Sequence, residues 1–391
     1  MDLDSIEGQI INGYFNLDEN PQKIEKRFEG EIFLNRFNLR ESYVKFHCHV
    51  PKPSGGDTIC FVTVDGSTLH LRFSTSYWSG NYFEEKFSIE EVVHPISDKK
   101  YIRTGSIKRL IYFPEEIEVL GFIVRKCERK YYEGEKRIRE NYFEWNYQNS
   151  ITKREIDKVL MSLSFLTNSS LFISEHSDGE TTTVFNMKSS KFTIPYMGSG
   201  MMFFPITIET VEGLINKIKW RYIYNFHLAY KHFCCAKNYE YQLYKGCSIL
   251  DYMISLFDRN LEFRDYKKRL KHSDKSSVLY SLLWYLNLDI STKSYLEKIF
   301  PETSWSEFKL NKRFEFFELR DSHIHRGQLF LTQEEVSKFQ RCLVAVNELI
   351  RILIPHLDKI DEWGFTNKPF YNTASSSEIV SARQDLIKWK L

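Results

Sequence analysis

The side chains best suited to chemistry gather in one short run, Glu318-Leu319-Arg320-Asp321-Ser322-His323-Ile324-His325-Arg326-Gly327. Its two histidines can exchange protons near neutral pH, and its two arginines can bind the oxygens of an anion. The carboxylate and the hydroxyl between them can orient these groups through hydrogen bonds. Such a set suits acid–base chemistry on a negatively charged substrate.

Helical geometry decides which of these side chains can act together. Asp321 and His325 are four residues apart and share one helix face, so the carboxylate could hold the imidazole in one tautomer. Arg320 lies about 140° around an ideal helix from His325. The two converge only if the last turn deforms at Gly327, or if they come from two copies of the chain. A plain polar helix end, with basic residues stabilising the helix dipole, is the other interpretation.

Other motifs in the sequence give weaker evidence of a functional site. The run His47-Cys48-His49 would place two histidines on one face of a strand, which is too few ligands for a metal site. His227 and His232 are five residues apart on an expected helix and do not chelate together. The sequence contains neither Gly-x-x-x-x-Gly-Lys-Ser/Thr nor Gly-x-Ser-x-Gly, so it has neither the phosphate-binding loop of NTPases nor the nucleophile motif of esterases. We therefore predict no metal site and no cofactor.

Two segments are locally basic. Residues 125–139 carry seven basic and three acidic side chains, and residues 264–275 carry six and two. Tyr131 and Tyr132 lie within the first segment, as stacking on single-stranded RNA would require. A charge run is more often a solvated face, so both interpretations stay open. If RNA binds, the predicted contacts are Arg129, Lys130, Lys268 and Arg269.

Composition narrows the class of protein. The chain has 391 residues with 54 Lys and Arg against 52 Asp and Glu, a net charge of +2 that excludes a polybasic nucleic-acid binder. Hydrophobic residues make up 42%, too many for a disordered chain. No apolar run is long enough for a membrane span, and seven cysteines without Cys-x-x-Cys indicate no disulfide framework. With an acidic start unlike a signal peptide, we expect a cytoplasmic protein with no membrane contact.

The first half of the chain is predicted to form strands and turns. Residues 43–50, 58–64 and 68–73 are rich in aromatic and β-branched side chains and are separated by glycine- and proline-containing turns. Further strands are expected at 107–113, 117–125, 182–187 and 191–196. One helix interrupts them, because Thr152 and Glu155 form a capping box before a helical apolar pattern.

From about residue 206 the apolar spacing becomes helical. The stripe from Val211 to Phe233 predicts one long helix, and Thr332 with Glu335 forms a second capping box before a stripe that reaches Leu357. Further helices are expected at 240–258, 276–287, 292–300 and 305–323. The fold class is therefore α+β, with a β-rich domain over 1–204 and an all-helical domain over 205–391.

The run around Arg320 also resembles a known family motif. Arg320 and His325 are spaced like the Arg-x4-6-His motif of HEPN-domain ribonucleases, and the run from Leu319 to Gly327 resembles the family's Leu-Arg-Asn-x-x-x-His-Arg-Gly. Asp321 stands where that family most often has Asn. The N-terminal part, with Gly13-Tyr14-Phe15-Asn16-Leu17-Asp18-Glu19-Asn20-Pro21 and Glu29-Gly30-Glu31-Ile32-Phe33-Leu34, is similar to ApeA-like anti-phage proteins.

The resemblance implies a β-rich sensor or targeting domain followed by a HEPN-like helical bundle. It implies a metal-independent endoribonuclease that acts as a homodimer or a higher even-numbered homo-oligomer. The enzyme would cleave RNA, with tRNA the expected substrate, in abortive infection after a phage-encoded trigger. His325 would act as general base or acid and Arg320 would bind the phosphate. Asp321 would orient either of them. Arg326 would contact a neighbouring phosphate, and His323 is the rival base.

Two non-enzymatic functions compete with this expectation. An inactive HEPN bundle could serve as a dimerisation, adaptor or antitoxin-like binding module, although the complete Arg and His pair argues against it. Alternatively, the β-rich domain could bind a carbohydrate or peptide beside a helical scaffold. Dimerisation through residues 305–330 would favour either HEPN interpretation, whereas a monomer would favour the third.

Overall fold

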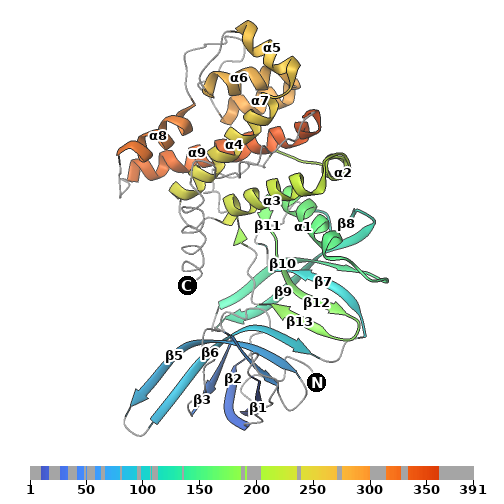
Figure 1. Ribbon diagram of the computed structural model, residues 1–391, viewed down its shortest axis with the longest axis vertical. Helices are drawn as coiled ribbons and strands as arrows, with labels where there is room; N and C mark the ends of the chain where they lie inside the picture. The colour runs from blue at the N-terminus through green and yellow to red at the C-terminus, as the bar shows by residue number, and fades with distance from the viewer. Residues whose placement is uncertain are drawn as a thin grey trace. The chain divides into compact units, whose positions relative to one another are not determined.

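The structure is a computed structural model that describes residues 10–16, 27–33, 42–47, 50, 58–62, 67–79, 82–94, 98–105, 107, 113–133, 136–185, 190–191, 204–235, 239–270, 275–299, 314–326 and 333–360. The chain divides into two compact units, Met1–Lys191 and Phe192–Leu391. The first contains an antiparallel sheet and the second contains helices, which confirms the predicted α+β class (Figure 1). Among the described helices, none combines the length and apolar character needed to cross a membrane.

The first strands of the sheet close on themselves. They are β1 (Ile10–Asn16), β2 (Arg27–Phe33), β3 (Tyr43–Phe46), β4 (Thr58–Val62), β5 (Thr68–Ser79) and β6 (Tyr82–His94). Their order is β3-β2-β1-β4-β5-β6, and β3 also pairs with β6, so the six strands form a ring. Alternating side chains such as Val44 and Phe46 are buried, and Phe46 meets Phe87 edge to face at 5.8 Å.

The remaining strands extend the sheet from β6. They are β13 (Thr182–Phe185), β12 (Ile173–Asp178), β7 (Lys100–Thr104), β10 (Lys136–Asn146), β9 (Phe122–Glu133) and β8 (Glu116–Val119), in that order. A second, small sheet pairs β11 (Ser169–Ser170) with β14 (Ser190–Lys191). β6 connects the two parts, because it pairs with β3 over Glu85–Ser88 and with β13 over Glu91–His94.

Two strand predictions need correction. The strand expected at 117–125 is wrong, because Leu120 and Gly121 have φ values of 51° and 82° and turn the chain into the β8–β9 hairpin. Positive φ at both turn positions suits a two-residue hairpin, but only the glycine signals it in the sequence. The strand expected at 107–113 is reduced to a bridge between Ile107 and Asn141, and Phe113 lies in a bend. Residues 108–112 and 192–196 lie outside the described residues.

The helix predicted from Thr152 is confirmed as α1 (Lys153–Thr167). The Thr152 hydroxyl accepts the N–H of Glu155 at 3.3 Å, and the Glu155 carboxylate accepts the N–H of Thr152 at 2.8 Å. This is the reciprocal pattern of a capping box. The helix ends at Asn168, which adopts the left-handed conformation with φ 53°.

The helical unit contains α2 (Ile208–Lys217), α3 (Trp220–Cys235), α4 (Tyr239–Phe257), α5 (Leu261–Leu270), α6 (Lys275–Tyr285), α7 (Ile290–Ile299), α8 (Glu315–Arg326) and α9 (Gln333–Leu353), followed by a 3-10 helix (Ile354–Lys359). The single helix predicted over Val211–Phe233 is wrong, because Ile218 is extended, with φ −92° and ψ 136°, and separates α2 from α3. Ile218 is itself buried, so the apolar stripe continues through the break. Residues 305–313 and Thr332 lie outside the described residues.

α4 packs against α3, α6, α8 and α9 (Figure 1). Gly246 on α4 permits this close packing, because a Cβ atom there would lie 2.5 Å from Val346 Cγ1 on α9 and 2.7 Å from Phe233 Cε2 on α3. The contact between α4 and α8 brings together the two helices that carry the candidate site.

Candidate active site

The residues predicted to act in catalysis lie on one helix. Arg320, Asp321, His323, His325 and Arg326 all belong to α8. The structure describes the side chains of Arg320 and Asp321, whereas those of His323, His325 and Arg326, and the whole of Gly327, lie outside the described residues. The backbone therefore fixes the spacing of the set, and the side-chain geometry concerns its first two members.

The course of α8 bears on how Arg320 and His325 could meet. Because the helix continues to Arg326, Asp321 and His325 share a face and Arg320 lies about 140° from His325. The described part of α8 shows no deformation that would bring Arg320 and His325 together within one chain. Their convergence across two copies of the chain remains a prediction.

The Arg320 guanidinium is held by two carboxylates. Its Nη1 donates to Asp251 Oδ2 at 3.0 Å, and its Nε donates to Asp321 Oδ1 at 2.9 Å. Nη2 lies 2.8 Å from the same Asp321 oxygen. The side chain of Arg320 is 11% exposed, against 27% for Asp251 and 51% for Asp321. The guanidinium is thus fixed at the edge of the core, where one face of the site meets solvent.

The charge at Arg320 is stabilised in spite of burial. Burial alone would lower the pKa of the guanidinium, but the charge of Asp251 and the hydrogen bond with Asp321 outweigh it and raise the pKa above its ordinary value. The guanidinium carbon also lies 5.1 Å from the centre of the Phe317 ring, one helical turn earlier. One cation and two carboxylates leave this small cluster with a formal charge of −1.

Asp251 is the site residue that sequence reasoning missed. It lies on α4 within the apolar run Ser248-Ile249-Leu250-Asp251-Tyr252-Met253-Ile254, where a single carboxylate is unusual and could have marked it. Cys247, one turn earlier, is buried with its Sγ 4.0 Å from the carbonyl oxygen of Phe316 on α8. Burial raises the pKa of the Cys247 thiol, so it is a packing group rather than a nucleophile.

The predicted RNA contacts on the sheet are engaged in ion pairs. Arg129 on β9 is mostly buried and its Nη2 lies 3.3 Å from Glu140 on β10. Lys130 is 52% exposed and its Nζ lies 3.1 Å from Glu128. Basic side chains in this segment are therefore paired with carboxylates, and Lys130 is more accessible than Arg129. The side chains of Tyr131 and Tyr132 lie outside the described residues.

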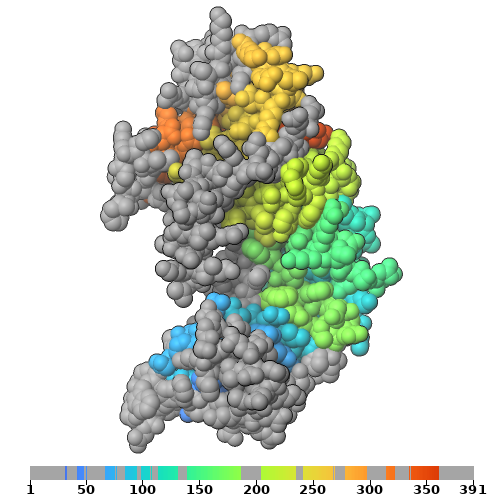
Figure 2. Space-filling model, in the orientation of Figure 1, coloured from blue at the N-terminus to red at the C-terminus, as the bar shows by residue number. Residues whose placement is uncertain are grey.

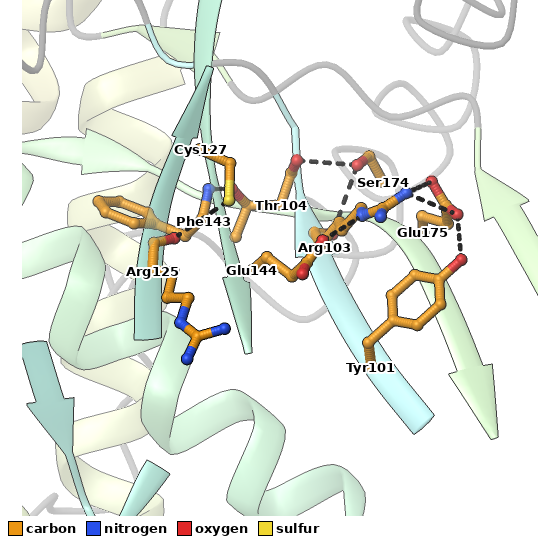
Figure 3. Close-up of polar contacts among 9 residues, drawn as sticks. All are labelled: Tyr101, Arg103, Thr104, Arg125, Cys127, Phe143, Glu144, Ser174 and Glu175. Atoms are coloured by element: carbon orange, nitrogen blue, oxygen red, sulfur yellow. Dashed lines mark hydrogen bonds and ion pairs between the residues drawn. The ribbon is translucent and has the colours of Figure 1, made fainter. Parts of the chain in front are cut away.

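The face of the sheet that carries Arg129 also carries a cross-strand network around Arg103 (Figure 3). Arg103 on β7 is the register partner of both Glu144 on β10 and Glu175 on β12. Its Nε donates to Glu144 Oε2 at 2.6 Å, and its Nη1 lies 3.2 Å from each Glu175 oxygen. Tyr101 also donates to Glu175, and burial together with this carboxylate raises the pKa of Tyr101 to about 12. These charges satisfy one another, which is typical of a structural network.

Residues 264–270 of the second basic segment lie in the helical unit, on α5, which Figure 2 shows at the surface in golden yellow. Lys268 is 67% exposed, and its Nζ lies 3.7 Å from Asp265, three residues earlier. The side chain of Arg269 lies outside the described residues. The two predicted basic segments thus belong to different units of the chain.

Over the residues that the structure describes, the motifs considered for metal binding form no cluster of ligands. Over the described ranges, no three His, Cys, Asp or Glu side chains come close enough together to hold a metal ion. His47 is exposed, 3.9 Å from Glu31, and Cys48 and His49 lie outside those ranges. His227 is buried, and burial lowers its pKa well below the ordinary value, so it is neutral.

Comparison with known proteins returns no family: no protein-family model, no curated protein and no solved structure matches this chain. The resemblance to HEPN ribonucleases and to ApeA-like proteins therefore stays a prediction. It rests on the spacing of the residues on α8 and on the short N-terminal segments.

Proposed function

We propose that the chain is a metal-independent endoribonuclease of the HEPN type that cleaves tRNA in anti-phage abortive infection. The observation that carries the proposal is the fixed guanidinium of Arg320, on the same helix as His325 and within a helical unit. A charged, oriented guanidinium at the edge of the core is suited to binding a phosphate.

The proposed reaction needs only the groups of α8 and the RNA itself. His325 takes the proton of a ribose 2′-OH, and the 2′ oxygen attacks the adjacent phosphorus. The bond from phosphorus to the 5′ oxygen breaks, and that oxygen leaves with the proton that the protonated His325, now acting as general acid, returns to it. The products are a 2′,3′-cyclic phosphate and a 5′-OH. Arg320 stabilises the charge on the phosphate oxygens, while Arg326 contacts a neighbouring phosphate and His323 is the rival base.

The proposed enzyme is a homodimer. Because Arg320 and His325 lie about 140° apart on α8, each active site would combine the arginine of one copy with the histidine of the other. The remaining RNA contacts in this proposal are Arg129, Lys130, Lys268 and Arg269, of which Lys130 and Lys268 are exposed. The sheet unit would sense the phage-encoded trigger.

A second function has one observation in its favour. The cluster of Asp251, Arg320 and Asp321 carries a formal charge of −1, and a phosphate entering it is opposed by both carboxylates. This favours a catalytically inactive HEPN-like adaptor that binds a partner without cutting RNA. The two functions differ in whether Arg320 and His325 are needed for RNA cleavage.

The deciding experiment is incubation of the purified full chain with total tRNA in EDTA, beside Arg320→Ala and His325→Ala, with the new ends mapped. We expect cyclic-phosphate ends from the wild type and a loss of about 100- to 1,000-fold in rate for each variant. Asp358→Ala is the matched control, because it removes an exposed partner of Lys217 in the same unit.

Full cleavage by either of the first two variants would refute the assignment of the site. If the wild type also fails to cleave with lysate of phage-infected cells, yet forms a dimer, the adaptor is the better description.

A further inference from the structure

We infer that Asp251 is a positioning residue that holds the Arg320 guanidinium in the orientation needed to bind a phosphate; this inference rests on the proposed function. Asp251 is on α4 and Arg320 is on α8, 69 residues apart in sequence, and the Nη1–Oδ2 distance is 3.0 Å. The contact therefore joins two helices and fixes the guanidinium relative to the core of the helical unit.

Asp321, the other carboxylate at Arg320, is less able to fix its position. It is the next residue on the same helix, it is 51% exposed, and both of its contacts use a single oxygen. Exposed ion pairs contribute little, because solvent screens them and the side chains remain mobile. Asp251 is only 27% exposed and its helix is held by close contacts, so its carboxylate is the more rigid partner.

The donors of the guanidinium show how a phosphate could be bound while Asp251 stays in place. Of the five N–H groups, Nη1 donates one to Asp251 and Nε donates its own to Asp321, while Nη2 lies 2.8 Å from the same Asp321 oxygen. Among the described residues, the remaining N–H on each terminal nitrogen has no further partner. These two groups can bind phosphate oxygens only if the plane of the guanidinium is fixed beforehand.

The first test measures the position of Arg320 without any need for catalysis. Phenylglyoxal modifies accessible arginines, and the labelled peptides of the full chain can be counted by mass spectrometry. We expect slow labelling of Arg320 in the wild type, faster labelling in Asp251→Ala, and an intermediate rate in Asp251→Asn, which keeps an oxygen acceptor. The matched control is Asp358→Ala, and Arg264, which is exposed, serves as the internal reference.

Unchanged labelling of Arg320 in a folded Asp251→Ala variant overturns the inference. Faster labelling of every arginine, with a lowered Tm, also overturns it, because it would show a general loss of structure.

The second test measures cleavage kinetics. We expect Asp251→Ala to lower kcat on the order of 100-fold with a smaller change in KM, and Asp251→Asn to recover part of that loss. Equal kcat in wild type and Asp251→Ala contradicts a positioning role. If Arg320 labelling responds to Asp251 but no form cleaves RNA, the proposed function fails alone. If Arg320→Ala abolishes cleavage but labelling ignores Asp251, the positioning role fails alone.

Discussion

Arg351 donates its Nε–H to the carbonyl oxygen of Phe204 at 2.9 Å. One turn earlier on α9, Glu348 accepts the N–H of the same residue at 2.7 Å and the hydroxyl of Tyr295 at 2.6 Å. Both charged side chains are buried. The helical unit thus binds both backbone polar atoms of a residue that precedes its first helix, although the sequence suggests that the first domain continues through Phe204.

Replacing Arg351 should destabilise the helical unit strongly. Arg351→Met leaves the Glu348 carboxylate buried without its compensating cation, and we expect a loss of about 3–5 kcal/mol in the free energy of unfolding. The double variant Arg351→Met/Glu348→Leu should lose less than the two single losses combined, because no uncompensated charge remains. Urea unfolding of Arg351→Met, Glu348→Leu and the double variant measures these losses. Strictly additive losses would contradict an energetic coupling between Arg351 and Glu348.

Two glycines on helices should respond to alanine with opposite signs. Gly246→Ala should lower stability by about 1–3 kcal/mol, because its Cβ would clash with Val346 and Phe233. Gly213→Ala on α2 should raise stability by about 0.5–1 kcal/mol, because alanine favours the helix and, apart from its chain neighbours and the backbone of its own helix, no atom of the described residues lies within 4 Å of the added Cβ. Thermal unfolding compares them directly. A stabilising Gly246→Ala would show that α4 and α9 pack less closely than described.

His356 should make stability depend on pH. Burial, with the nearby charge of Lys359, lowers the pKa of His356 to about 4, whereas the unfolded chain titrates near 6.5. Between these values the unfolded state binds more protons, so the free energy of unfolding rises with pH and is lost as the pH falls from about 6.5 towards 4. We expect His356→Gln to flatten this part of the curve in urea titrations, and parallel curves for variant and wild type would refute the assignment.

Sequence signals predict an element correctly where short-range hydrogen bonds determine it. The capping box at Thr152 and Glu155 predicts the start of α1 correctly, because both of its hydrogen bonds lie within four residues. The break at Ile218 was missed because a buried apolar residue occupies it, and the β8–β9 turn was missed because Leu120 gives no sign of a positive φ. The intrinsic conformational preferences of isoleucine and leucine do not indicate the helix break at Ile218 or the turn at Leu120.

The candidate site shows the same limit. The spacing of Arg320, Asp321 and His325 on one helix could be predicted, since it depends only on helical periodicity. Asp251 could not be placed beside Arg320, because their contact depends on how α4 packs against α8. The cross-strand partners of Arg103 depend in the same way on strand order, which alternation within single strands does not determine.

The end of the sheet at β8 has a consequence for how the protein behaves at high concentration. Since β3 pairs back onto β6, β8 is the terminal strand of the described sheet. It is only four residues long, and Glu116 and Glu118 are exposed on it, directly after Glu115. A short strand lined by carboxylates is a poor template for another chain to add to by backbone pairing. The acidic edge strand therefore protects the sheet against edge-to-edge pairing with other copies, which would lead to aggregation.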